Sequence, residues 1–379
     1  MTRAGRLRAE DRLARMVLGQ CLGVRRGETV TVETWDHALP WARAVVLEAR
    51  RRGCEPTLVV EDEETFFRSL AQSSGRTVPG APAAVAEASD AYVYFPGPAN
   101  FSRLLGLSGE ARDAVLGRHG AEWWRGARRA GLRAARLAVG AATSTAAARF
   151  GVDREAWERE LVRGSLVAPD RLARAANHLV RRLHRAQQVR IVHPNGTDLT
   201  VELLHAPAII EDGRVDRADR RAGRLWTQIP TGVVGVPLLS GAAEGLWESN
   251  WATYHRFSDP PLRLGARFTF HRGRLSEYAF DRGGAAFARE YARGGRGREQ
   301  PSGLLLGVNP AISHAPEVAE VAAGAVSLLL GRNRSLGGRN SSRFAYLTTL
   351  TGATVELDGE PFLREGDPVA SPRSTRMAD

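Results

Sequence analysis

Side chains that can transfer protons are present in this chain, but they do not form a known catalytic pattern. The candidates for acid–base catalysis are Glu244, His314 and Tyr346, because a carboxylate, an imidazole and a phenol can each give or accept a proton. None of the nine histidines lies in an H-E-x-x-H or H-x-D pair, in which two neighbouring side chains could share a metal. The sequence therefore indicates catalytic candidates but no reaction.

Tryptophans and carboxylates lie close together in the run from Glu244 to Trp251, which reads E-G-L-W-E-S-N-W. Two carboxylates and two indoles could line a pocket for a cationic or planar ligand, with Trp247 as a substrate-binding residue. The alternative is an amphipathic surface element in which Trp247 and Trp251 pack against each other at positions i and i+4. The sequence leaves both interpretations open.

A group of arginines in the last quarter of the chain could bind an anion. Arg334, Arg339 and Arg343 lie close together in the sequence, and guanidinium groups bind carboxylates and phosphates through paired hydrogen bonds. Ser327 and Asn340, in the same region, could add hydrogen bonds to the ligand. These residues predict a small or peptide-like substrate with an anionic group. The alternative is that the arginines are surface residues of an arginine-rich protein.

The basic composition limits the possible chemistry. All 53 basic residues are arginines, since the chain contains no lysine. This excludes a lysine Schiff base, a pyridoxal phosphate anchor and a P-loop lysine. The net charge of +11 would favour a nucleic-acid partner. The arginines alternate with acids, however, as in Asp153-Arg154-Glu155, which is typical of solvated helix faces. Complete replacement of lysine by arginine is typical of a GC-rich genome, and we expect no nucleic-acid partner.

Cysteines and apolar runs give information about the compartment. Cys21 and Cys54 are the only cysteines, which is too few for a disulfide framework. No apolar run approaches the roughly 18 residues of a membrane-spanning helix, and residues 1–10 lack an apolar signal segment. We expect no membrane partner and predict a cytoplasmic protein.

The elements that must position these side chains change character near residue 188. Before it, β-branched strands alternate with helices, which predicts a parallel, Rossmann-like sheet. No G-x-G-x-x-G follows a strand, so no dinucleotide is indicated. After it, the pattern is β-rich. The sequence predicts an α/β protein with an N-terminal Rossmann-like parallel α/β domain at 1–187, a C-terminal β-rich α+β domain carrying the active-site cavity at 188–367, and a disordered tail at 368–379.

The expected elements can be given by residue number. Helices are expected at 39–52, 153–163 and 170–187, and a helix or a helix plus a strand over 317–330. Segments 71–85 and 97–120 are expected to be rich in loops, and a hairpin is expected at 354–360. The expected strands are 29–34, 56–60, 91–95, 132–139, 189–192, 198–204, 262–271 and 278–280.

Several short motifs occur in one order along most of the chain. They are N-G-T-D-L-T at 195–200, the block at 232–245, G-L-L-L-G-V-N-P at 303–310, and G-A-V-S-L-L-L-G followed by R-N-R-S-L-G-G-R-N-S-S-R-F-A-Y-L at 324–347. Together with the helix–turn–strand–helix pattern at 13–51, they make the chain similar to the thermophilic metalloaminopeptidase family (aminopeptidase T, leucyl aminopeptidase-like). The corresponding C-terminal frame of that family reads roughly G-T-V-H-I-A-x-G, then G-G-x-N-x-S-x-x-H-x-D.

The resemblance implies a pair of divalent metals, but the positions of the metal ligands are substituted. Valine, glycine, alanine and leucine offer no donor atoms, and an arginine would repel cations. The iron of the related dihydroxypyridine dioxygenases would need the same H-x-D positions. We therefore expect no metal and no cofactor, and the resemblance implies a homodimer. The six substituted positions are Val233, Gly303, Ser327, Arg334, Ala345 and Leu347.

Two classes of function agree with these observations. The first is an aminopeptidase-T-like protein that has lost the dinuclear site and acts as a metal-independent enzyme on a small or peptide-like substrate, in specialised biosynthesis. The second is a catalytically inactive, dimeric binding or scaffold protein. A divergent aminopeptidase with other ligands is a third reading. An open, polar cavity at the inherited centre would favour the enzyme, and a collapsed apolar one would favour the binding protein.

Overall fold

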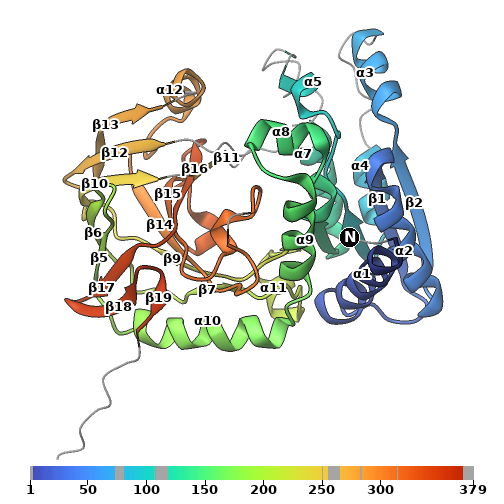
Figure 1. Ribbon diagram of the computed structural model, residues 1–379, viewed down its shortest axis with the longest axis horizontal. Helices are drawn as coiled ribbons and strands as arrows, with labels where there is room; N and C mark the ends of the chain where they lie inside the picture. The colour runs from blue at the N-terminus through green and yellow to red at the C-terminus, as the bar shows by residue number, and fades with distance from the viewer. Residues whose placement is uncertain are drawn as a thin grey trace, which may run out of the picture.

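The computed structural model describes residues 3–72, 81–105, 107, 118–249, 251–254, 265–281, 284–313 and 315–369. His314 and most of the predicted tail lie outside these residues, and Pro368 closes the last short strand. In Figure 1 a parallel sheet with its helices occupies the right-hand part, and two antiparallel sheets occupy the left-hand part. The two-part α/β architecture expected from the sequence is confirmed.

Five parallel strands form the first sheet, in the order β2-β1-β3-β4-β8. Strand β8 comes from the 188–367 segment, so the chain returns to the first sheet after it has begun the second part. The edge strand β2 is mostly exposed, whereas β3 and β4 are mostly buried. The strands are β1 (Thr29–Trp35), β2 (Glu55–Glu61), β3 (Ala91–Tyr94), β4 (Arg133–Leu137) and β8 (Trp226–Ile229).

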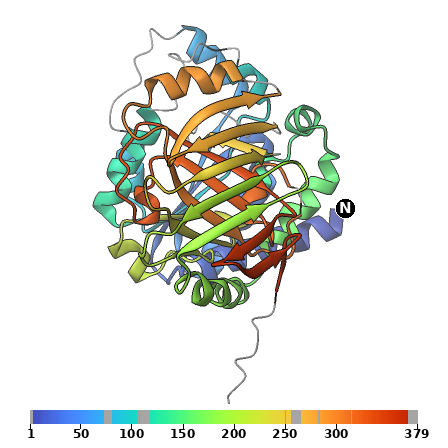
Figure 2. The same ribbon diagram turned by 90° about the vertical axis from the view of Figure 1, so that its left-hand side faces the viewer.

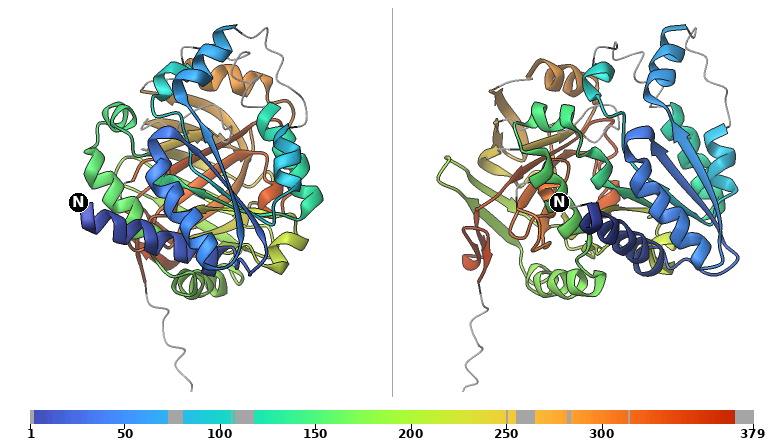
Figure 3. Two further views of the ribbon diagram at one scale, coloured as in Figure 1. Left: turned by 90° about the vertical axis from the view of Figure 1, so that its right-hand side faces the viewer. Right: turned by 45° about the vertical axis from the view of Figure 1, so that its right-hand side comes forward.

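Helices cover both faces of this sheet. Neighbouring residues of a strand point to opposite faces, and Val93 packs in the core with α1 and α2, whereas Tyr92 packs with α4 and α7. Figure 3 shows this part from the right-hand side of Figure 1. Within the described residues, no helix has both the length and the apolar composition needed to cross a membrane. The helices are α1 (Arg3–Met16), α2 (Leu39–Arg51), α3 (Glu63–Gln72), α4 (Ala81–Glu87), α5 (Phe101–Leu105), α7 (Arg118–Ala130), α8 (Ser144–Phe150), α9 (Arg154–Ser165), α10 (Pro169–Leu183), α11 (Arg217–Arg221) and α12 (Gly284–Arg293).

Two antiparallel sheets form the second part (Figure 2). One has eight strands in the order β13-β12-β10-β6-β5-β17-β18-β19, and the other has six in the order β11-β16-β15-β14-β9-β7. The strands are β5 (Gln188–Val192), β6 (Asp198–Glu202), β7 (Ile209–Glu211), β9 (Val233–Pro237), β10 (Glu244–Ser249), β11 (Trp251–Tyr254), β12 (Ala266–His271), β13 (Arg274–Phe280), β14 (Pro301–Gly307), β15 (Val326–Gly331), β16 (Ala345–Leu350), β17 (Thr354–Leu357), β18 (Glu360–Arg364) and β19 (Asp367–Pro368).

The two antiparallel sheets share one core. Trp247 of β10 is completely buried, and its Nε1 donates a hydrogen bond to the hydroxyl of Thr348 on β16 at 2.9 Å. Phe268 and Tyr346 lie in the same core, with ring centroids 6.1 Å apart. Because Trp247 and Thr348 belong to different sheets, their hydrogen bond fixes one sheet against the other. Trp247 therefore lies in a packed core, and neither the pocket nor the surface element considered above describes it.

Most expected strands and helices are present, with small shifts at their ends. The largest difference lies at 317–330, where no α-helix forms. This segment instead contains a 3-10 turn at Ala319–Val321 and strand β15. Strand β15 is buried on both faces, and a continuous apolar run cannot be distinguished from a buried helix by periodicity alone. The expected loop at 71–85 also contains the start of α4.

A buried asparagine joins the two parts of the molecule. Asn309 follows β14 and has no exposed surface. Its side-chain nitrogen donates to the carbonyl of Gly164 in α9 at 3.0 Å and to that of Thr231, between β8 and β9, at 2.7 Å. Its side-chain oxygen accepts a hydrogen bond from the N–H of Ala311 at 3.1 Å. Buried carbonyl groups require such partners, so the asparagine amide stabilises this junction.

Replacing Asn309 with aspartate should destabilise the protein. The Asn309→Asp variant loses both donated bonds and places a carboxylate oxygen beside two buried carbonyls, which should cost at least about 2 kcal/mol. Asn177→Asp is the matched control, because the Asn177 amide donates to the Ala173 carbonyl at 2.8 Å on an exposed helix face. The control should change stability by less than about 0.5 kcal/mol. Chemical unfolding monitored by circular dichroism measures both, and equal effects would contradict the junction role of Asn309.

Candidate functional site

Three of the six positions that the sequence resemblance assigns to metal ligands, Gly303, Ser327 and Leu347, lie on one face of the six-stranded sheet. Gly303, Leu329 and Leu347 are register partners on β14, β15 and β16, and Leu305 pairs with Ser327 in the next row of the same face. Side chains of a strand alternate between faces, so the even-numbered residues of β15 point to the core between the sheets and the odd-numbered ones point away from it. Of the other assigned positions, Val233 packs in the core of the parallel sheet and Arg334 is exposed.

Leucine side chains fill this face of the six-stranded sheet. Leu336, from a 3-10 turn at Arg334–Leu336, packs with Leu329 and Leu347, and all three are nearly completely buried. A Cβ atom on Gly303 would lie 2.3 Å from Leu336 Cδ1, and one on Gly235 would lie 2.7 Å from Leu336 Cδ2. The two glycines therefore make the room that Leu336 occupies. We call this set of leucines, with Leu305 and Ala345 packed against it, the leucine cluster.

The donor atoms at this surface do not fit a pair of divalent metals. Ser327 is completely buried, and its hydroxyl lies 2.8 Å from that of Thr349, so these two side chains satisfy each other. Metal pairs in proteins require several carboxylate, imidazole or thiolate donors. Among the described residues, no three His, Cys, Asp or Glu side chains converge in a metal-binding arrangement.

The three residues suggested for acid–base catalysis do not meet. Glu244 lies on the surface, 2.7 Å from His271 Nδ1, and accepts a hydrogen bond from the N–H of Arg272 at 2.9 Å. This N–H and the His271 imidazole lower the pKa of Glu244. Tyr346 is completely buried among aromatic rings between the sheets. His314 lies outside the described residues. Residue type suggested these candidates, whereas the strand pairing separates Glu244 from Tyr346.

The polar residues near the leucine cluster are either exposed to solvent or hydrogen-bonded within their own loop. Arg334 and Arg339 are exposed. Asn340 organises its own loop, because its side-chain nitrogen donates to the carbonyl of Gly297 at 2.8 Å and to Gln300 Oε1 at 3.1 Å. Its side-chain oxygen accepts a hydrogen bond from the N–H of Ser342. These contacts explain Asn340 as a structural residue, and Arg334 and Arg339 as exposed arginines at the edge of the cluster.

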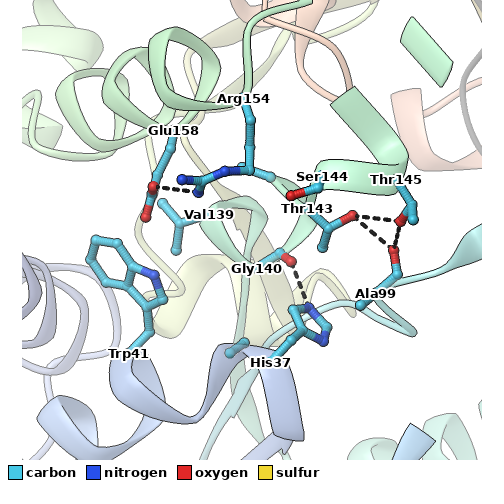
Figure 4. Close-up of a pocket in the computed structure, with 12 residues that line it drawn as sticks. His37, Trp41, Ala99, Val139, Gly140, Thr143, Ser144, Thr145, Arg154 and Glu158 are labelled. Atoms are coloured by element: carbon cyan, nitrogen blue, oxygen red, sulfur yellow. Dashed lines mark hydrogen bonds and ion pairs between the residues drawn. The ribbon is translucent and has the colours of Figure 1, made fainter. Parts of the chain in front are cut away.

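A cavity of about 370 Å³ lies elsewhere, at the carboxyl end of the parallel sheet. The strand order reverses between β1 and β3, and open α/β sheets bind ligands at the carboxyl ends of the strands beside such a reversal. The walls come from segments that follow β1, β3 and β4 and from α9 (Figure 4). We call it the switch-point cavity. Its polar lining residues are His37, Thr143, Ser144, Thr145, Arg154 and Glu158.

An imidazole and an ion pair give this cavity its chemical character. His37 Nε2 lies 2.9 Å from the carbonyl oxygen of Gly140. A carbonyl only accepts, so Nε2 carries the hydrogen, and the buried Nδ1 lies 3.8 Å from the Asp36 carboxylate. Arg154 Nη1 lies 3.1 Å from Glu158 Oε2, and the Glu158 side chain is only 9% exposed. The cavity thus combines an imidazole, a guanidinium and a carboxylate.

Threonine hydroxyl groups form another part of the wall of the switch-point cavity. The Thr143 hydroxyl donates to the carbonyl of Ala99 at 2.8 Å, and the Thr145 hydroxyl donates to the same carbonyl. Thr143 also caps α8 through its side-chain oxygen. No glycine-rich fingerprint marks these residues, so they were not among the candidates predicted from the sequence. The useful signal was the position of Asp36-His37 and Thr143-Ser144-Thr145 just beyond two expected parallel strands.

The comparisons with solved structures agree with the two-part α/β fold. Aminopeptidase T (AmpT) from Thermus thermophilus superposes with a TM-score of 0.72 at 18% sequence identity, over 96% of this chain and 99% of that chain. A 2,5-dihydroxypyridine dioxygenase from Pseudomonas putida KT2440 superposes with a TM-score of 0.59 at 16% identity, over 99% of this chain and all of that chain. No protein-family model and no curated protein matches the sequence. The fold is therefore of the aminopeptidase T type.

The leucine cluster makes a prediction about stability. Gly303→Ala should destabilise the protein by about 1–3 kcal/mol, because the new methyl group collides with Leu336. Leu336→Ala should cost about 2–4 kcal/mol through the lost packing. The double variant should lose less unfolding free energy than the sum of the losses of the two single variants, because Leu336→Ala removes the side chain with which the new methyl group collides. Leu239→Ala, at a 44% exposed leucine, is the control for a generic truncation. Strictly additive unfolding free energies would show that Leu336 does not lie over Gly303.

Proposed function

We propose that this protein has the aminopeptidase T fold without a dinuclear metal centre, and that it binds a small, peptide-like molecule in the switch-point cavity. The leucine cluster is the observation that carries the first part. Side chains without donor atoms occupy the surface that the sequence resemblance assigns to the metals, and Leu336 takes the volume above it. The collapsed, apolar character of this surface favours the binding-protein hypothesis over metal-dependent hydrolysis.

The switch-point cavity supplies the second part of the proposal. Arg154 can hold a carboxylate through two parallel hydrogen bonds, and Glu158 can hold an ammonium group. In the structure the two side chains form an ion pair at 3.1 Å. A ligand with both a carboxylate and an ammonium group, such as an amino acid or a short peptide, matches this arrangement of charges. The volume of the cavity agrees with a ligand of this size.

A metal-independent enzyme that uses the same cavity is the second candidate. Its support is the His37 imidazole, which lines the cavity and is held in place by the hydrogen bond from Nε2–H to the Gly140 carbonyl, because an imidazole can transfer protons. A role in specialised biosynthesis and a homodimeric state, both suggested above, belong to this proposal as predictions. A His37→Gln variant that still binds the ligand but no longer converts it would establish the enzyme.

The proposal predicts that the purified protein carries no stoichiometric transition metal. Elemental analysis of protein prepared without a His-tag should find zinc, cobalt, manganese and iron well below one ion per chain. Chelator treatment should leave the thermal unfolding midpoint unchanged, because no three His, Cys, Asp or Glu side chains of the described residues converge in a metal-binding arrangement. One or two ions per chain whose removal lowers the midpoint would show that the leucine cluster does not replace the metal site.

Arg154 provides a direct test of ligand binding. Calorimetric titration with a panel of amino acids and dipeptides should identify a ligand. Arg154→Gln should then weaken its binding roughly 10- to 100-fold, the loss expected for one charge-assisted contact. Arg159→Gln is the matched control, because Arg159 lies on the same helix, pairs with Glu155 at 3.3 Å and does not line the cavity. Equal affinities of both variants, or no ligand in the panel, would refute the proposed site.

A further inference from the structure

A second cavity lies on the other face of the parallel sheet, and aromatic rings form its walls. Its volume is about 170 Å³, and it shares no lining residue with the switch-point cavity. Strands β1 and β3 contribute Trp35, Tyr92 and Tyr94, and helix α7 contributes Trp123 and Trp124. The rings pack edge to face, with centroids 5.3 Å apart for Tyr92–Trp123 and 5.1 Å apart for Trp123–Trp124. Each ring has an electron-rich face and an electron-poor edge, and a ligand cation is attracted to the face.

Two carboxylates also line this cavity. Glu33 lies on β1, and Glu61 lies at the end of the neighbouring strand β2. Glu33 accepts a hydrogen bond from the Tyr92 hydroxyl. Within the described part of the chain, neither carboxylate forms an ion pair with an arginine. Burial, together with the negative charges of Glu33 and Asp62, raises the pKa of Glu61.

Among the described residues, the arginine that lines the cavity is Arg136, and it does not pair with these carboxylates. Arg136 Nη2 lies 2.7 Å from Glu317 Oε2, and Arg136 Nη1 lies 3.0 Å from Gln228 Oε1. Gln228 lies on β8 and Glu317 lies in the segment after β14, whereas Glu33 and Glu61 lie on β1 and β2. Because Arg136 already has an anionic partner, the cavity keeps the negative charge of two carboxylates.

Ordinary core packing explains the rings but not the charges. Tyr92 belongs to the small core beneath α4 and α7, and the tryptophans pack against it. An apolar core would not by itself place two carboxylates without cationic partners beside indole rings, since a partly desolvated negative charge costs stability. A ligand with a positive charge would offset this cost and would be attracted to the ring faces as well.

We propose that this aromatic-carboxylate cavity binds a small organic cation of the alkylammonium class, of about the size of choline. The rings surround the methyl groups of the cation, and Glu33 and Glu61 supply the opposite charge. The cavity is smaller than the roughly 300–1,000 Å³ of pockets for drug-sized ligands, which limits the ligand to a compact molecule. This site is independent of the function proposed above, because no residue of the switch-point cavity takes part in it.

Titration with choline and with 3,3-dimethyl-1-butanol, its uncharged analogue of the same shape, tests the proposal. Both titrations use the full chain at constant ionic strength, with calorimetry and tryptophan fluorescence as readouts. Choline should bind saturably and quench the fluorescence, and tetramethylammonium should bind as well. The neutral alcohol should bind at least about tenfold more weakly, because it lacks the cation–π and carboxylate contacts.

Two variants locate the binding to this cavity. Glu61→Gln should raise the choline Kd about three- to tenfold while the protein keeps its circular dichroism spectrum, because Glu61 lies at the exposed rim. Glu64→Gln, at a 54% exposed residue of α3 that pairs with Arg68, is the control and should bind like the wild type. Arg154→Gln should also leave choline binding unchanged. Equal affinity for the neutral alcohol, no saturable binding of either cation, or a Glu61→Gln Kd equal to that of the control would each overturn the proposal.

Discussion

The side chain of Asn309 is the contact on which the arrangement of the two parts depends. A single buried amide binds the carbonyls of Gly164 and Thr231, which belong to different layers of the molecule. Asn333 has a similar role, since its side-chain nitrogen donates to the Ser302 carbonyl and its oxygen accepts from the N–H of Asn340. Asn309 matches the asparagine of the G-x-N-P motif, and Asn340 matches that of the G-G-x-N motif. The side-chain contacts of Asn309 and Asn333 are all with the protein backbone, so both residues have a structural role.

The leucine cluster depends on two glycines. Glycine at 235 and 303 leaves space above two neighbouring strands, and Leu336 fills that space from a short turn. A leucine that contacts other leucines gains free energy from burial and needs no charged partner. This face of the six-stranded sheet is therefore stabilised by apolar packing.

Local patterns predicted much of the fold but little of the candidate site. The strand predicted at 29–34 and the helix predicted at 39–52 agree with β1 and α2 to within one residue at their ends. The position of β8 in the parallel sheet depends on contacts between distant segments, which no local pattern contains. Trp247 and Tyr346 have side chains suited to binding and catalysis, yet their strands pair so that both face the core between the sheets. The wall formed by His37, Thr143 and Thr145 could have been predicted from the strand ends, because these residues follow β1 and β4, whereas Arg154 and Glu158 come from α9.

Anomalous scattering at the metal absorption edge tests the central claim most directly. Crystals grown with excess zinc or cobalt would be measured at the edge of each metal. We expect no anomalous peak within bonding distance of Gly303, Ser327 or Leu347, and density for Leu336 above Gly303 as in the structure described above. Two anomalous peaks above these strands, with Leu336 displaced from the sheet, would contradict the account.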